Sequence, residues 1–119
     1  MYELSKQFRF EAAHTLRREI AAEGSRRIHG HSYRAEVTVR GLPQAASGML
    51  LDLGLVDAAL HKVRDALDHR FLDEVEGLGP GTLENLAAFI AREAAPALPG
   101  LYRVAVSRDS TGESCAFFP

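Results

Sequence analysis

The sequence predicts an α+β fold in which a four-stranded antiparallel sheet carries two helices on one face. Three observations predict it. Apolar and polar residues alternate towards both ends of the chain, two central stretches repeat apolar residues at helical spacing, and turn-forming residues separate these stretches. The resulting order is strand, strand, helix, helix, strand, strand. Two antiparallel hairpins with two helices packed against them satisfy that order.

The first two strands are predicted over residues 2–14 and 31–41. In the first stretch the even positions are mostly apolar and the odd positions are mostly polar. Lys6 interrupts this alternation and indicates a bulge or an exposed edge. The second stretch alternates more cleanly and ends at the turn signal that begins at Gly41. Between the strands, residues 15–27 are polar and arginine-rich, which predicts a loop.

Two helices and a closing hairpin follow. Asp52 is a suitable N-cap for a helix that runs to about Leu67, and Thr82 for a second helix that ends before Pro96. The apolar residues at helical spacing are Val56, Leu60, Val63 and Leu67 in the first helix, and Leu83, Leu86, Ala87, Ile90 and Ala94 in the second. Residues 102–106 and 114–118 are predicted to pair around a polar turn.

Composition limits the class of protein. With 119 residues, 46% of them hydrophobic, the chain is expected to form one globular domain over residues 1–119. A formal net charge of −2 without a basic cluster argues against nucleic-acid binding. No apolar run is long enough to span a membrane, and the first residues lack the pattern of a signal peptide. Cys115 is the only cysteine, so a cytoplasmic protein without an internal disulfide is expected. Free sheet edges favour a ring-like homo-oligomer.

Three histidines form the first candidate site. His29 and His31 lie two residues apart at the start of the second strand, and His14 ends the first strand. Pairing of the two strands would bring the three imidazoles together on the face covered by the helices, where an unpaired imidazole is costly. Three neutral imidazoles and one open position form the arrangement of a catalytic zinc site. The alternative is a chance His-x-His pattern of exposed strand residues.

Acidic residues and one further histidine supply other candidates. Asp68 and His69 follow the first helix, where His69 could act as a general acid or base that the carboxylate tunes. The alternative is a histidine that stabilises the end of the helix. Asp109 and Glu113 flank the last turn. Either carboxylate could accept two N–H groups from the guanidine-like edge of a heterocycle, or both could simply belong to a polar turn.

Four motifs carry a resemblance to a known family. They are Phe10-Glu11-Ala12-Ala13-His14, Ile28-His29-Gly30-His31-Ser32-Tyr33, Leu67-Asp68-His69-Arg70-Phe71-Leu72 and Thr82-Leu83-Glu84-Asn85-Leu86. Together they resemble the 6-pyruvoyl-tetrahydropterin synthase / 6-carboxy-tetrahydropterin synthase family, and the resemblance covers essentially the whole chain.

The resemblance implies a tunnelling fold (T-fold) assembled as a hexamer of two trimers, with active sites at subunit interfaces. It implies Zn²⁺ held by His14, His29 and His31, and Asp68 with His69 as a proton relay that requires a turn or a second subunit. The implied activity converts 7,8-dihydroneopterin triphosphate into a 6-carboxy- or 6-pyruvoyl-tetrahydropterin, in queuosine or related biosynthesis. Two alternatives are side-chain cleavage to 6-hydroxymethyl-dihydropterin and a homologue that binds zinc or a pterin without turnover.

The chain departs from the family pattern at two positions. Ser25 stands where the family usually has a catalytic cysteine, and its hydroxyl is far less acidic than a thiol. Some relatives have a glutamate there, but Glu23 is two residues away. The place of the family's pterin-anchoring glutamate falls on Arg108 when aligned forward from Val104 and Val106, and near Ser110 when aligned backward from the last strand. Glu113, or else Asp109, is therefore expected to replace it.

Overall fold

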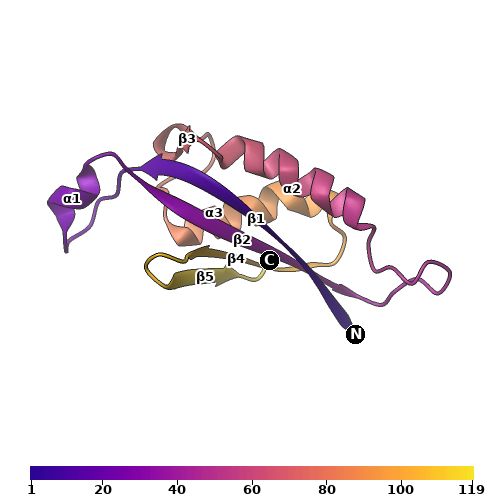
Figure 1. The fold of residues 1–119 in the computed structure, drawn as a ribbon. Coiled ribbons are helices and arrows are strands. Elements are labelled where there is room, and N and C mark those ends of the chain that lie inside the picture. Colours follow the sequence, from indigo (N-terminus) through magenta and orange to yellow (C-terminus); the bar gives the residue numbers. More distant parts are fainter.

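A computed structural model describes residues 1–119. Its five strands form one mixed sheet in the spatial order β3-β1-β2-β4-β5, and two long helices cover one face of it (Figure 1). The strands are β1 (Tyr2–His14), β2 (His29–Gly41), β3 (Arg70–Phe71), β4 (Leu101–Arg108) and β5 (Glu113–Phe117). The helices are α1 (Ala22–Arg26), α2 (Leu53–Leu67) and α3 (Leu83–Ala94), with short 3₁₀ turns over Leu72–Glu74 and Ala95–Ala97.

The β1–β2 hairpin is the longest pairing in the sheet. Its ladder runs without interruption from Tyr2 opposite Gly41 to His14 opposite His29. Lys6 pairs with Val37 inside this ladder, so the bulge predicted as one possibility there is absent. The irregularity lies instead between Thr38 and Val39, where β2 faces β4. As the alternation predicts, Phe10 and Tyr33 are buried, and they stack at 4.9 Å between ring centroids.

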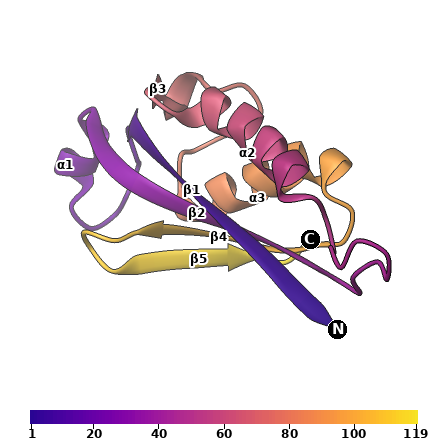
Figure 2. The same cartoon turned by 45° about the vertical axis from the view of Figure 1, so that its right-hand side comes forward.

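Helices α2 and α3 begin at the predicted caps. The Asp52 carboxylate accepts the N–H of Gly54 at 2.8 Å, and the Thr82 hydroxyl accepts the N–H of Asn85 at 3.1 Å. Both helices lie on the same side of the sheet (Figure 2). The buried residues of α2 are the predicted ones, Val56, Leu60, Val63 and Leu67. None of the helices combines the length and the apolar character needed to cross a membrane.

The predicted four-stranded antiparallel sheet in the order ββααββ is wrong, because a fifth strand joins the sheet. Residues 70–71 pair in parallel with Ala12 and Ala13, which makes the sheet mixed. His69 makes this pairing possible: its φ of 57° turns the chain after α2, and its N–H donates to the Glu11 carbonyl at 2.6 Å. Such a backbone conformation is uncommon outside glycine, so the apolar pattern gives no sign of it.

The predicted loop over residues 15–27 also contains structure. Residues 22–26 form the short helix α1, which follows Ala21 in a left-handed conformation. The N–H of Leu16 donates to the carbonyl of Ser25 at 2.7 Å, which closes the segment on itself. This unit projects beyond the end of the sheet (Figures 1 and 2).

Candidate metal centre and adjoining cavity

The β1–β2 pairing brings the three candidate histidines together. His14 lies directly opposite His29, and His31 lies opposite Ala12, so all three side chains leave the same face of the hairpin. Ring centroids are 4.6 to 5.0 Å apart, and one ligand nitrogen from each ring lies within 4.8 Å of the other two. In a tetrahedral zinc site with each nitrogen 2.0–2.1 Å from the ion, the nitrogens lie about 3.4 Å apart, so zinc binding requires the rings to move closer by up to about 1.4 Å.

Hydrogen bonds to the imidazoles leave a lone pair on the same nitrogen of every ring. Nδ1 of His14 donates to the carbonyl of Gly81 at 2.8 Å, and Nδ1 of His29 donates to the carbonyl of Arg27 at 2.7 Å. Since a carbonyl can only accept, Nε2 of both rings carries the lone pair. At His31, Nη1 of Arg108 lies 3.3 Å from Nε2, which must therefore be the acceptor. Donation from the outer nitrogen to a carbonyl is the usual support for a metal-binding histidine.

Burial favours the neutral form of two of these imidazoles. It lowers the pKa of His14 against the opposing effect of the Gly81 hydrogen bond. Burial, followed by the positive charge of Arg108, lowers the pKa of His31 to about 4. The His14 side chain is 1% exposed, and its Nε2 has no hydrogen-bond partner. Because a divalent ion would bind neutral imidazoles and also satisfy this buried atom, the residues present fit a zinc ion.

The end of β1 is held in place next to the cluster. The carboxylate of Asp73 accepts both the N–H and the hydroxyl of Thr15, the residue after His14. Burial opposes ionisation of Asp73, but the hydrogen bonds from Thr15 outweigh it and lower the pKa. An ionised Asp73 therefore fixes the backbone that carries His14.

A cavity of about 470 Å³ opens beside the cluster, within the size range of small-molecule sites. His14 and His31 form one wall of it. The remaining lining residues are Leu16, Arg17, Arg18, Tyr33, Gly81, Thr82, Leu83, Glu84, Arg108, Thr111 and Glu113. Sequence reasoning did not assign Tyr33, Glu84 or Arg108 to the site. A signal existed for Arg108, which continues the inward-facing positions of Val104 and Val106 on β4.

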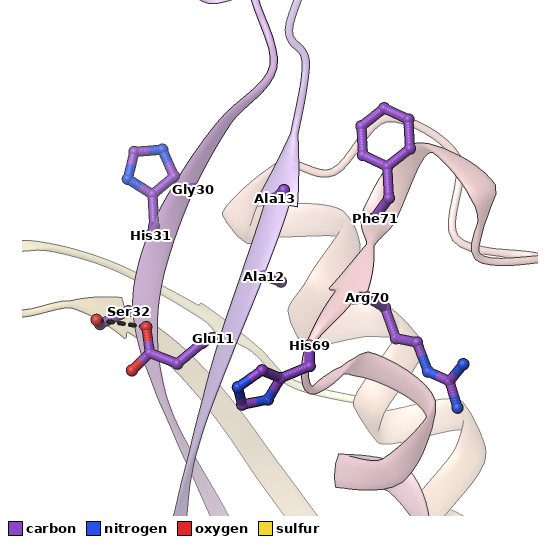
Figure 3. Close-up of a pocket in the computed structure, with 9 residues that line it drawn as sticks. All are labelled: Glu11, Ala12, Ala13, Gly30, His31, Ser32, His69, Arg70 and Phe71. Carbon is purple, nitrogen blue, oxygen red and sulfur yellow. Dashed lines mark hydrogen bonds between the residues drawn. The ribbon is translucent and has the colours of Figure 1, made fainter.

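The structure brings Asp68 and His69 into contact with each other, but not with the three histidines. Because of the left-handed backbone at His69, its Nδ1 lies 3.0 Å from an Asp68 carboxylate oxygen. The hydrogen bond from the N–H of Glu11 lowers the pKa of Asp68. The His69 side chain is 78% exposed, and β1 runs between it and His31 (Figure 3). Neither residue lines the cavity beside the three histidines.

The other candidates separate into two locations. Glu113 lines the cavity and pairs with Arg108, whereas Asp109 lies on the sheet face away from the helices, where Arg34 binds it at 3.0 and 3.1 Å. Asp109 is therefore engaged in a surface ion pair outside the cavity. Ser25 is buried within α1 and does not line the cavity either.

Comparisons with known proteins identify one family. The family model described as 6-pyruvoyl tetrahydropterin synthase matches residues 3–118. The 6-carboxy-5,6,7,8-tetrahydropterin synthase of Synechocystis sp. is 36% identical over 126 residues, which cover 100% of this chain and 95% of that protein. The dihydroneopterin monophosphate aldolase of Pyrococcus furiosus is 32% identical over 91 residues, which cover 76% of this chain and 73% of that protein. Some other relatives align over about half of their own length.

The fold is also found among solved structures. The 6-pyruvoyl tetrahydropterin synthase of Caenorhabditis elegans superposes with a TM-score of 0.84 at 24% identity, covering 99% of this chain and 95% of that one. At this identity the likeness concerns the fold alone. The family match along nearly the whole chain goes further, and from it we conclude that the chain belongs to the 6-pyruvoyl tetrahydropterin synthase family.

Proposed function

We propose that the protein is a zinc-dependent pterin synthase that converts 7,8-dihydroneopterin triphosphate into a 6-substituted tetrahydropterin. One observation carries the proposal: three imidazoles, each with a lone pair on Nε2, converge beside a cavity of about 470 Å³. The similarity to a 6-carboxy-tetrahydropterin synthase along the full chain supports a pterin as the substrate.

In this proposal His14, His29 and His31 hold the zinc ion. When bound, zinc acidifies substrate hydroxyl groups and stabilises the negative charge that develops on their oxygens. The acidic residues of the cavity orient the substrate. Glu84 and Glu113 can accept N–H groups from the guanidine-like edge of the pterin ring, since hydrogen bonds from Thr111 and then Arg108 lower the pKa of Glu113 and keep it ionised.

Proton transfer is assigned to the Asp68–His69 pair. The carboxylate of Asp68 accepts a hydrogen bond from Nδ1–H of His69, which leaves the lone pair on Nε2 of His69 available to take a proton from a substrate carbon. Within one chain this imidazole is 78% exposed and lines a second pocket, which it shares with Glu11, Ser32 and His31, and not the cavity beside the three histidines (Figure 3). We therefore propose that His69 completes the site of a second copy in a homo-oligomer, with a hexamer of two trimers as the expected assembly.

The shape of the chain supports an assembly. Its dimensions are 57 × 22 × 22 Å, because the β1–β2 hairpin extends past the helices. The sheet ends in the unpaired edge of β5, next to the exposed side chains of Phe117 and Phe118. Unpaired edges and exposed aromatic side chains are typical of surfaces that pair with another chain.

A side-chain cleavage activity is the second candidate, because Ser25 replaces the usual thiol and lies outside the cavity. The Pyrococcus furiosus relative is an aldolase, and a solved Plasmodium vivax 6-pyruvoyltetrahydropterin synthase carries alanine in place of a catalytic glutamate. A third reading is a zinc- and pterin-binding homologue without turnover. The contact between Asp68 and His69 argues against it, since a binding protein needs no proton relay.

Incubation of the zinc-loaded protein with 7,8-dihydroneopterin triphosphate, with and without chelator, distinguishes the three candidate functions. A chelator-sensitive 6-carboxy- or 6-pyruvoyl-tetrahydropterin supports the proposal, a 6-hydroxymethyl product supports cleavage, and binding without any product overturns both. His69→Ala should lose activity while keeping zinc. His61→Ala is the matched control, because its side chain is 71% exposed and lies on α2.

Subunit mixing tests the shared site. His29→Ala and His69→Ala chains are each expected to be inactive as pure oligomers. Unfolded together and refolded as mixed oligomers, they should regain part of the activity, since some interfaces then combine an intact metal cluster with an intact His69. No recovery in mixed oligomers of the correct size would show that each chain contains its own complete site.

A further inference from the structure

Three buried side-chain atoms of the protein lack any hydrogen-bond partner, and they gather at one place. They are Nε2 of His14, the hydroxyl of Tyr33 and Nε of Arg108. All three residues line the cavity beside the histidine cluster. An unpaired buried polar atom is costly, and several in one cavity indicate a ligand that pairs with them. A metal ion accounts for His14 but leaves the other two atoms unpaired.

Tyr33 and Arg108 offer hydrogen-bond donors to the same region. The Arg34–Ser107 pairing between β2 and β4 places the next residues, Tyr33 and Arg108, side by side. Tyr33 is 1% exposed and the Arg108 side chain 17% exposed, so neither donor is fully accessible to solvent. The Nε–H of arginine can only donate. The matching group on a ligand is therefore an acceptor oxygen.

The rest of the Arg108 side chain holds the guanidinium in position. Nη2 pairs with Glu113, and Nη1 donates to Nε2 of His31. A metal ion on His31 would replace the second hydrogen bond and leave Nη1 as a further free donor next to the metal. Arg17 and Arg18 also line the cavity, so its arginines outnumber its two carboxylates. The cavity with a divalent ion thus favours an anionic ligand.

We propose that Arg108 and Tyr33 bind a carboxylate carried by the ligand next to the metal, and so select a 6-carboxypterin. This inference rests on the proposed pterin synthase function and narrows it. A carboxylate provides two acceptor oxygens, one for the unpaired Nε–H of Arg108 and one for the unpaired hydroxyl of Tyr33. A 6-hydroxymethyl group is neutral, as is a 6-pyruvoyl group, and neither offers an anionic oxygen to the unpaired Nε–H of Arg108.

Calorimetric titration of the zinc-loaded protein with 6-carboxypterin and with 6-hydroxymethylpterin tests the proposal. The carboxylate ligand should bind about tenfold more tightly or better, the range expected for hydrogen bonds to a charged group. Arg108→Gln should remove this preference and leave the affinity for 6-hydroxymethylpterin within about twofold. Arg108→Lys keeps the positive charge but loses the planar guanidinium with its Nε–H, so it should give an intermediate preference. Tyr33→Phe should reduce the preference by less, about threefold to tenfold, since it removes a neutral hydroxyl.

Arg34→Gln is the matched control. It removes a guanidinium that also has an acidic partner, Asp109, but on the opposite face of the sheet, and it should leave the preference unchanged. Zinc content is measured for every variant by atomic emission and should be retained. Equal affinity of the wild-type protein for both pterins, or a preference that survives Arg108→Gln, overturns this inference alone. Failure of the zinc-loaded protein to bind either pterin overturns the proposed function as well.

Discussion

Tyr33→Phe should make the metal-free protein more stable. The Tyr33 ring is 1% exposed and stacks on Phe10 at 4.9 Å, whereas its hydroxyl has no hydrogen-bond partner. Burial raises the pKa of this hydroxyl to about 12, so it stays neutral throughout the usual pH range. Phenylalanine keeps the ring and its packing and removes only the unpaired group.

The expected size follows from the cost of that group. A buried hydroxyl without a hydrogen bond destabilises a protein by about 1–3 kcal/mol. Removing the oxygen also leaves a small void, which takes back part of the gain. We expect the free energy of unfolding to rise by about 1–2 kcal/mol, and the melting temperature by about 3–8 °C for a chain of this length.

Urea unfolding followed by circular dichroism, with chelator and at one protein concentration, measures the change. Tyr102→Phe serves as the control, because the Tyr102 ring lies at the surface under the Arg40 guanidinium, 3.5 Å from its centroid. Its free energy of unfolding should change by less than about 0.5 kcal/mol. A Tyr33→Phe protein that is less stable than the parent would show that the hydroxyl is satisfied in the free protein, and the argument for a ligand at this position would lose its basis.

Three further outcomes are expected. His29→Ala should abolish zinc binding, measured by atomic emission after desalting, while His61→Ala keeps the full zinc content. Ser25→Cys introduces a more acidic group but should leave synthase turnover unchanged, because residue 25 is buried within α1 outside the cavity; a raised rate would place residue 25 at the reacting centre. The hydrogen bond from Glu11 lowers the pKa of Asp68, so its contribution to stability is present above the ordinary value of 3.8 and is lost as the pH falls through the lower folded value. In the presence of chelator, Asp68→Asn should therefore make the free energy of unfolding fall less steeply as the pH is lowered. The same pH dependence in the variant and the parent protein would contradict this.

The long elements and the convergence of the three histidines could be predicted because both depend on regular periodicity. A period of two places His14 and His31 on the inward faces of their strands, and hairpin pairing then brings them together. The stripe on α2 follows in the same way from a period near 3.6. Each of these features repeats over many residues, so one irregular position such as Lys6 does not obscure it.

The short elements could not be predicted because they depend on single backbone conformations. β3 exists because His69 adopts a φ of 57°, and α1 begins after Ala21 at a φ of 56°. Neither residue is a glycine, the residue that most readily adopts a positive φ. The contact between Asp68 and His69 is another consequence of the same turn, since adjacent residues on an extended chain would point apart.

Side-chain alternation also distinguishes the two sides of the sheet near the C-terminus. On β4, Val104, Val106 and Arg108 share one face, which brings the arginine to the histidine cluster. The next residue, Asp109, falls on the opposite face by the same rule and binds Arg34. The family resemblance favours both carboxylates near the last turn equally, whereas side-chain alternation along β4 predicts that Asp109 lies on the sheet face away from the helices.

The uninterrupted pairing of β1 with β2 limits which changes in length the chain can accept. Deleting or inserting one residue inside either strand would invert the facing of every side chain beyond that point, so His14 would turn away from its two companions. The segment from residue 15 to residue 28 has no such restriction, because the paired strands hold both of its ends. Natural or engineered length variation should therefore concentrate in that segment and be excluded from the strands on either side.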